Sequence, residues 1–360
     1  MQNKSALNLN AEQAYINKKV GVAKVGMMLS WVSSITAILF GIFNTVASSL
    51  IEADTGSDLS GPLNQAIVCI TILGIGEIFA GIMTLVYNAA KGKGIKEFKR
   101  MTGFKISWMM LLSALAAGPL ATGLQVTAYS MAGITYVTAI LALSPVLTAI
   151  LGRIIFKENL SKRAVFGILL VVAGALVTTF IGTPDTAGSN FMVGIILACI
   201  CPIGFALEGM FSTYAGDLID PIEGCGFYRT ICSGIMGLAA MLIIAGCSGN
   251  IGVWTATVKA VFTNPLTLVF VILFAAFVAL SYNTTYVGFN KCGPSRCLAI
   301  VNTAPIWSIP IGLIFAQLMP KFYSYDVTGA AIIGAVVVTI GVILVVMKPS
   351  ELFKLRDVEE

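Results

Sequence analysis

Three ionisable side chains lie inside long apolar stretches of this sequence: Glu77, Glu208 and Arg229. A charged group in a bilayer is costly unless it is paired or hydrated, so each is a candidate for substrate binding or ion coupling. Glu208 and Arg229 are expected at similar depth on consecutive helices. They form either an ion pair that only neutralises both groups, or a cavity-facing pair whose Arg229 offers its planar set of donors to a substrate carboxylate.

Glu77 is expected within about one helical turn of the bilayer midplane. Its own half of the chain has no basic residue at that depth. An unpaired carboxylate there favours its protonated form, which is the property that a proton-coupling site needs. The alternatives are a carboxylate that binds a substrate cation, and a neutral Glu77 hydrogen-bonded to a neighbouring helix.

Uncharged polar and aromatic residues in the same stretches could line a central cavity, although an amide in hydrocarbon more often bonds to a neighbouring helix. These candidates are Trp31, Asn44, Gln125, Tyr282, Asn283, Asn302 and Trp307. Pro145 and Pro305 are hinge candidates, because a proline inside a helix frees a carbonyl and bends the axis. Kinks that face lipid are the alternative.

Apolar runs of about 20 residues, the length of a helix that crosses the hydrocarbon core, recur along the chain. Of its 360 residues, 57% are hydrophobic and 11% are charged. We therefore predict an all-α membrane protein with ten transmembrane helices, near 25–50, 64–89, 106–127, 131–154, 164–182, 192–215, 224–246, 266–288, 295–318 and 327–347.

Basic residues are distributed unevenly between the predicted loops. With the N-terminus in the cytoplasm, all 22 Lys and Arg residues except Lys259, Lys321 and Arg229 fall on the cytoplasmic side. This is the pattern of the positive-inside rule for ten crossings with both termini inside. We expect a multi-pass protein of the cell membrane, specifically the bacterial inner membrane, with cytoplasmic tails at 1–24 and 348–360.

Three blocks of the first half recur in the same order in the second half. The aligned pairs are 26–46 with 194–214, 141–154 with 301–314, and 167–177 with 334–344. Each half then holds five crossings, and an odd number inserts the second half upside down relative to the first. The predicted architecture is two inverted five-helix repeats, 25–182 and 192–347, joined by an outer linker at 183–191.

The end of the first half resembles a known family. Pro145 is followed by an apolar run, by KENLS at 157–161, and by Gly167 and Gly174 seven residues apart. This pattern is similar to that of the drug/metabolite transporter superfamily in its ten-helix, EamA-type form. The resemblance implies secondary transport of small metabolites through a central cavity lined by helices other than the fifth and tenth. The second half lacks the acidic residue of this pattern, with Gln317 and Leu318 where the first half has Lys157 and Glu158.

We predict a secondary-active transporter, an exporter of small organic metabolites or drugs, that works by alternating access and is not an enzyme. The sequence contains no GxxxxGK[ST] motif for ATP, and no filter-like loop or repeated acidic ring of a channel. The alternative is an integral membrane enzyme acting on a lipid-linked substrate, which would need clustered acidic residues or histidines at a membrane surface.

We expect no cofactor and no metal. The chain has no histidine, and Cys199 and Cys201, two residues apart on a helix, point away from each other. The expected partners are a small-molecule substrate, the lipid bilayer and, as an option, a coupling proton. No nucleic acid is expected, and a homodimer is left open.

Overall fold

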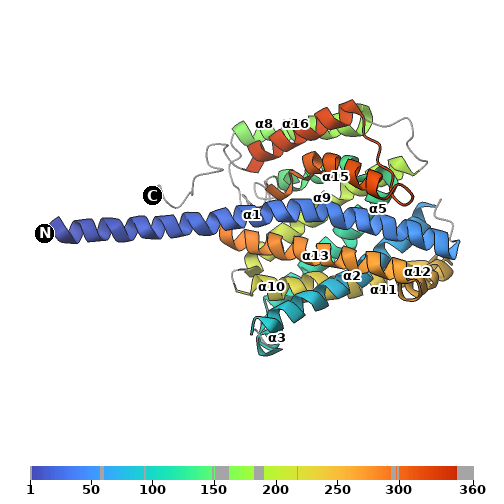
Figure 1. Ribbon diagram of the computed structural model, residues 1–360, viewed down its shortest axis with the longest axis horizontal. Helices are drawn as coiled ribbons and strands as arrows, with labels where there is room; N and C mark the ends of the chain where they lie inside the picture. Colours follow the sequence, from blue (N-terminus) through green and yellow to red (C-terminus); the bar gives the residue numbers. More distant parts are fainter. Residues whose placement is uncertain are drawn as a thin grey trace.

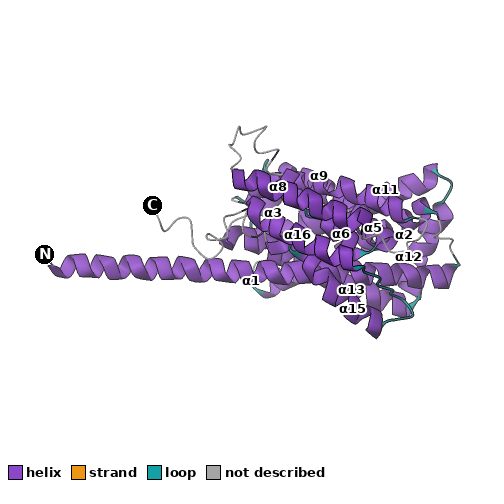
Figure 2. Ribbon diagram, turned by 90° about the horizontal axis from the view of Figure 1, so that it is seen from above, coloured by secondary structure: helices purple, strands orange, loops and turns teal. Residues whose placement is uncertain are grey.

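The computed structural model describes residues 2–56, 61–92, 95–147, 150, 162–181, 190–216, 218–292, 297 and 300–346. These residues form helices and loops without a strand, as Figure 2 shows, so the all-α prediction is confirmed for them. Three short segments are π-helices, which hold one more residue per hydrogen-bonded ring than an α-helix. The elements are α1 (Gln2–Thr55), α2 (Pro62–Ala90), α3 (Ile95–Thr102), α4 (Ser107–Leu115), η1 (Ala116–Thr122), α5 (Gly123–Ala132), α6 (Ile134–Leu141), α8 (Lys162–Leu176), η2 (Val177–Ile181), α9 (Phe191–Gly216), α10 (Pro221–Gly224), η3 (Cys225–Cys232), α11 (Ser233–Cys247), α12 (Ile251–Thr263), α13 (Pro265–Cys292), α15 (Ala304–Leu318) and α16 (Gly329–Val346).

Several of these helices are long and apolar enough to cross a membrane, which makes the chain a multi-pass membrane protein. Among the described residues there are six: Val20–Thr55, Pro62–Ala90, Ser107–Ala132, Phe191–Ser212, Ile222–Cys247 and Pro265–Cys292. They coincide with predicted crossings one to three and six to eight. Shorter apolar helices coincide with the other four predicted crossings: Ile134–Leu147, Val165–Leu176, Ala304–Leu318 and Gly329–Leu344. Parts of those four crossings lie outside the described residues, and the count of ten stays a prediction.

Two segments outside the predicted crossings are also helical. The predicted tail at 1–24 continues the first crossing, because α1 begins at Gln2 and projects from the bundle (Figure 1). The predicted outer loop that carries Lys259 contains α12, which packs against α2 and α13 and buries Ala260 and Val261. With 13 residues, α12 is too short to stand out in a hydropathy window of about 19.

Turn residues set where the long helices begin and end. Pro62 and Pro265 open α2 and α13, where the missing N–H of proline would have no helical partner anyway. The side chain of Asn264 caps α13 by accepting a hydrogen bond from the backbone N–H of Leu266 at 3.0 Å. Between α5 and α6, Gly133 adopts a φ of 86°, a conformation that favours glycine and allows the sharp reversal there.

Glycines bring the helices of the two halves close together in matching pairs. A Cβ on Gly26 of α1 would lie 2.9 Å from Cys292 at the end of α13, and one on Gly194 of α9 would lie 2.9 Å from Ala132 at the end of α5. The α2–α11 contact involves a glycine on each side. A Cβ on Gly74 would lie 3.0 Å from the carbonyl oxygen of Gly234, and a Cβ on Gly234 would lie 2.6 Å from the carbonyl oxygen of Gly74. The sequence spacing from Ala132 to Cys292 equals that from Gly74 to Gly234.

The α8–α16 pair lies at one edge of the molecule (Figure 1) and is also joined through glycines. A Cβ on Gly174 would lie 2.8 Å from the backbone nitrogen of Val338, and one on Gly341 would lie 2.7 Å from that of Val171. Real Cβ atoms do not approach backbone this closely, so neither helix can accept a side chain at these positions without moving apart from the other. Close approach of this kind is how small residues join membrane helices.

We predict that Gly174→Ala lowers the free energy of unfolding by about 1–3 kcal/mol, the usual cost of overpacking. Gly246→Ala is the matched control, because nothing lies within 4 Å of a Cβ at Gly246 near the end of α11. There alanine should stabilise the helix by about 0.5–1 kcal/mol. Thermal unfolding in detergent measures both variants. Equal effects would contradict this account of the α8–α16 contact.

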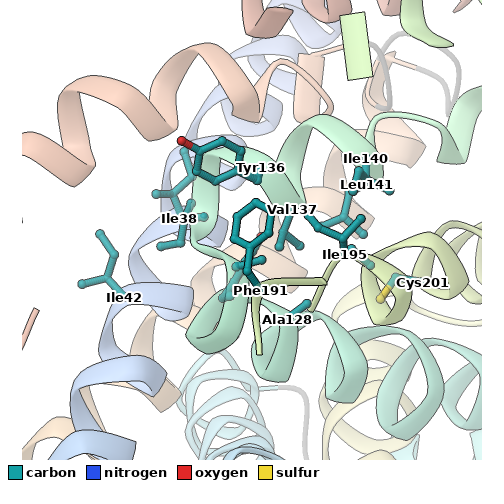
Figure 3. Packing of buried hydrophobic residues seen from close by; sticks show 14 of the residues in the cluster. Ile38, Ile42, Ala128, Tyr136, Val137, Ile140, Leu141, Phe191, Ile195 and Cys201 are labelled. Carbon is teal, nitrogen blue, oxygen red and sulfur yellow. The ribbon is translucent and has the colours of Figure 1, made fainter. Parts of the chain in front are cut away.

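A buried apolar cluster fills the part of the bundle between α1, α5, α6 and α9 (Figure 3). The rings of Tyr136 and Phe191 meet edge to face within it, with centroids 5.5 Å apart.

The helices α1 and α13 run antiparallel, and Gly26 of α1 lies beside Cys292 of α13. We call the two ends of the bundle the Cys292 end and the Pro265 end. The cluster continues along α1 to Leu50, toward the Pro265 end.

Candidate functional site

The three ionisable residues singled out in the sequence come together in the core. Arg229 lies in η3, with its Nη1 2.8 Å from Oε1 of Glu77 on α2 and its Nε 2.9 Å from Oε1 of Glu208 on α9. Arg229 and Glu77 are each 1% exposed, and Glu208 is 15% exposed. The ion pair expected between Glu208 and Arg229 is present. The expectation that Glu77 lacks a basic partner is wrong, because its partner comes from the other half of the chain.

All five N–H groups of the Arg229 guanidinium have an acceptor. Besides the two carboxylates, Nη1 donates to Oγ of Ser233 at 3.5 Å, and Nη2 donates to Oγ1 of Thr122 at 2.7 Å and to the carbonyl of Ala117 at 3.4 Å. A guanidinium has five such donors. In this conformation Arg229 therefore has no donor left for a substrate carboxylate. This argues against the interpretation that Arg229 offers its donors to such a carboxylate.

The two carboxylates differ in how completely they are held. Oε2 of Glu77 accepts a hydrogen bond from Oγ of Ser233 at 2.6 Å, and Oε1 accepts from the hydroxyl of Tyr282 at 3.5 Å. Oε1 of Glu208 accepts from the hydroxyl of Tyr286 at 3.1 Å. No donor among the described residues reaches Oε2 of Glu208. Glu77 is thus a fixed part of the core, whereas Glu208 keeps one oxygen unbonded.

A cavity of about 150 Å³ lies beside Glu208 and Arg229. Glu77 does not line it and sits behind the guanidinium. The Tyr282 ring forms part of the wall and packs against Arg229, with Cζ 4.0 Å from the ring centroid. Most other lining residues are aromatic or carry small polar groups: Ser33, Phe40, Thr122, Gln125, Tyr129, Thr138, Ser144, Phe205, Ser281, Thr285, Tyr286, Phe289 and Asn302. The remainder are Ala37, Leu141, Pro145, Gly209, Val301 and Ala304.

Only some of the uncharged candidates reach this cavity. Gln125, Tyr282 and Asn302 line it, and Gln125 donates through Nε2 to the hydroxyl of Tyr129 at 2.5 Å. The amides of Asn44 and Asn283 instead tie helices together, through the carbonyl of Cys69 at 3.3 Å and Oγ1 of Thr84 at 2.9 Å. Helix-to-helix bonding was the alternative named for such amides.

The two tryptophan candidates also lie outside the cavity lining. Trp31 of α1 and Trp307 of α15 contact each other edge to face, with centroids 5.5 Å apart and an interplanar angle of 86°. This geometry is favourable for aromatic pairs. Their observed role is a contact between α1 and α15.

Both hinge candidates sit just after a break in a helix. Helix stops at Leu141, a two-residue turn follows, and helix resumes at Ser144, directly before Pro145. The second half repeats this pattern, since a turn at 302–303 precedes α15, in whose first turn Pro305 lies. Each proline therefore lies beside an interruption of the helix, and its role as a hinge stays a prediction. Each proline opens a helix, where its fixed φ fits well.

Several lining residues were absent from the sequence-based candidates. Tyr286 and Phe289 follow Tyr282 along α13 at helical spacing, so one face of that helix lines the cavity. This periodicity was the available signal. Phe205 and Thr122 gave none, because a phenylalanine or threonine in an apolar helix is common at any position.

Part of the chain is similar to a known family of membrane proteins. Residues 39–180 match the EamA-like transporter family. The chain contains an EamA-like transporter domain. The expected resemblance to the drug/metabolite transporter superfamily is confirmed.

Relatives extend the similarity beyond that domain. Over 283 residues the chain is 23% identical to protein LicB of Haemophilus influenzae, covering 78% of this chain and 89% of LicB. It is 25% identical over 210 residues to the uncharacterized transporter YyaM of Bacillus subtilis, covering 57% of this chain and 61% of YyaM. It is 22% identical over 317 residues to the uncharacterized transporter sll1164 of Synechocystis sp., covering 86% and 84%. Two of these three relatives carry the name of a transporter.

We predict that Arg229→Gln lowers the free energy of unfolding by about 3–5 kcal/mol, because it leaves two buried carboxylates without their shared cation. Lys105→Gln, in the exposed turn between α3 and α4, is the control and should change stability by less than about 0.5 kcal/mol. Thermal unfolding of the purified protein in detergent compares them. A similar, small effect of both substitutions would show that the buried triad contributes little.

Proposed function

We propose that this protein is a secondary-active exporter of small organic solutes that works by alternating access and does not use ATP. The observation that carries the proposal is the triad of Glu77, Glu208 and Arg229, in which residues of both halves of the chain meet beside a cavity. A charged site at the boundary between two halves is what a transporter needs if moving one half against the other is to change access.

The matching glycine contacts support two inverted five-helix repeats, 25–182 and 192–347, as the moving halves. The α1–α13 contact at Gly26 corresponds to the α9–α5 contact at Gly194, as an exchange of the two halves requires. The breaks before Pro145 and Pro305 correspond in the same way and border the cavity, which favours them as hinges. With both termini in the cytoplasm, the Cys292 end of the bundle is the cytoplasmic one.

The cavity is placed asymmetrically along the bundle. All of its α13 residues, from Ser281 to Phe289, lie in the half of that helix nearer the Cys292 end. The apolar cluster of Figure 3 includes Ile42, Val46 and Leu50, which follow one another along α1 toward the Pro265 end. We take this arrangement as the conformation closed to the outside.

Two aromatic residues, Tyr129 and Phe289, could act as gates between this conformation and the one open to the outside. The ring of Tyr129 sits on Gly41, where a Cβ would lie 2.6 Å from it. Gly209, the partner of Gly41 in the aligned blocks, faces the cavity with nothing within 4 Å of its Cβ position. The spacing that relates Ala132 to Cys292 also relates Tyr129 to Phe289. In the opposite conformation, we propose, Phe289 packs on Gly209 while Tyr129 leaves Gly41.

Gly209→Val should therefore hold the protein closed to the outside, because the added side chain occupies the place that Phe289 needs. We expect transport in proteoliposomes to fall by about tenfold or more, the effect of a barrier raised by about 1.4 kcal/mol or more. A cysteine introduced at Asn302 should stay reactive toward an impermeant reagent from the cytoplasmic side. Gly252→Val, where nothing lies within 4 Å of a Cβ, is the control. Unchanged transport by the Gly209 variant would contradict this gate.

Transport itself is tested with a solute that the native protein selects. Metabolites are screened for thermal stabilisation of the purified protein, because a ligand that binds only the native state raises its stability. A hit is then loaded into proteoliposomes, with and without a pH gradient. We expect the solute to cross chemically unchanged, faster than in protein-free vesicles. A chemically altered product would favour the alternative, a membrane enzyme acting on a lipid-linked substrate.

A coupling proton is part of the proposal. Two carboxylates share one guanidinium, so the triad is electrically neutral only when a proton or another cation joins it. A rate that depends on the pH gradient in the same vesicles is the expected result.

A further inference from the structure

We propose that the cavity binds a small organic monocation, held at the unbonded oxygen of Glu208. This inference rests on the proposed transport function, since it names the class of solute that the same cavity takes. It is carried by the charge balance of the triad, by the bonding of each of its oxygens and by the character and volume of the cavity.

The triad carries one uncompensated negative charge. Both oxygens of Glu77 accept hydrogen bonds, from Arg229, Ser233 and Tyr282, as an ionised carboxylate does. Oε1 of Glu208 likewise accepts from Arg229 and from Tyr286. Two carboxylates thus surround one guanidinium, and among the described residues that line the cavity no Lys, second Arg, Asp or second Glu alters this balance.

Arg229 also lines the cavity, but it has no N–H group left to bind a ligand. Its five N–H groups are bonded, and the Tyr282 ring covers one face at 4.0 Å from Cζ. The negative charge is accessible, because Glu208 lines the cavity, is 15% exposed and has Oε2 without a donor among the described residues. This oxygen would repel the carboxylate of a solute, because both are negatively charged. An ammonium group would instead donate a hydrogen bond to it and neutralise the excess charge.

The rest of the wall suits a cation with an apolar body. Phe40, Phe205, Tyr286 and Phe289 supply rings, whose faces attract cations. The volume of about 150 Å³ limits the ligand. An apolar protein cavity of about that volume holds a benzene molecule, so we expect a solute of about six to eight non-hydrogen atoms.

Three ring compounds of similar size and different charge test the proposal: cyclohexylammonium, cyclohexanol and cyclohexanecarboxylate. Binding to the full-length protein in detergent is measured by calorimetry. The cation should bind at least about tenfold more tightly than the alcohol, since a hydrogen bond to a charged group contributes more than 1.4 kcal/mol. The anion should bind more weakly than the alcohol. Equal binding of cation and alcohol, tighter binding of the anion, or no binding of the cation at 10 mM would each overturn the proposal.

Variants of Glu208 locate the effect. Glu208→Gln should reduce cyclohexylammonium binding by at least about tenfold while cyclohexanol binding stays unchanged, which also shows that the variant is folded. Glu208→Asp keeps the charge and should keep preference for the cation over the alcohol. Glu52→Gln, the same chemical change on an exposed part of α1, should leave all three affinities unchanged. Unaltered cation binding by Glu208→Gln would overturn the assignment to this residue.

The transport function and the binding of a monocation can be tested separately. If a neutral or anionic metabolite from the stabilisation screen is carried across vesicles, transport stands and the charge assignment is wrong. If the cation binds as expected and no solute crosses, the site stands and the transport function is wrong.

Discussion

The burial of one guanidinium between two carboxylates is the constraint on which the rest of this structure depends. Removing three charges from water costs far more than any single contact returns, so the arrangement is stable only if nearly every polar atom finds a partner. The partners of Arg229 in η3 come from α2, η1 and α9, together with Ser233 at the start of α11, and α13 adds two tyrosine hydroxyls that bond the carboxylates. Rotation of any of these elements would break several charged hydrogen bonds at once. The triad therefore fixes the relative rotation of helices from both halves, while apolar packing alone would tolerate several arrangements.

A nearly symmetric scaffold holds an asymmetric site. The alignment of 26–46 with 194–214 pairs Glu208 with Phe40, and the spacing that relates Gly74 to Gly234 pairs Glu77 with Gly237 and Arg229 with Cys69. None of the three has a carboxylate or a basic side chain as its counterpart. The glycines that let helix backbones approach one another recur at matching positions in both halves, whereas the charged residues of the site do not. Packing and charge can thus change independently in such a chain, because the glycines that set helix distance are separate from the residues that face the cavity.

Hydropathy, basic residues and glycine spacing were sufficient to predict the all-α membrane fold and the long helices. They did not predict α12, because a helix of 13 residues is shorter than the window that identifies a crossing. For the site, charge in an apolar context selected Glu77, Glu208 and Arg229. The sequence could not reveal that Arg229 contacts Glu77, since that contact joins residues 152 positions apart on helices whose rotation depends on tertiary packing. The same reason explains why Asn44 and Asn283, chemically equivalent to Asn302, lie outside the cavity.

The π-helical segments η1 and η3 face each other across the guanidinium, and Thr122 and Ala117 of η1 accept hydrogen bonds from it. Each π turn contains one residue more than the α-helix around it, so it acts as an angular offset between the two parts of its helix. A single-residue deletion in η3 would restore continuous α-helix and turn everything on one side of it by about 100°. The triad therefore depends on the number of residues in η1 and η3 as well as on their identity, and a single insertion or deletion there would turn Arg229 away from its two carboxylates.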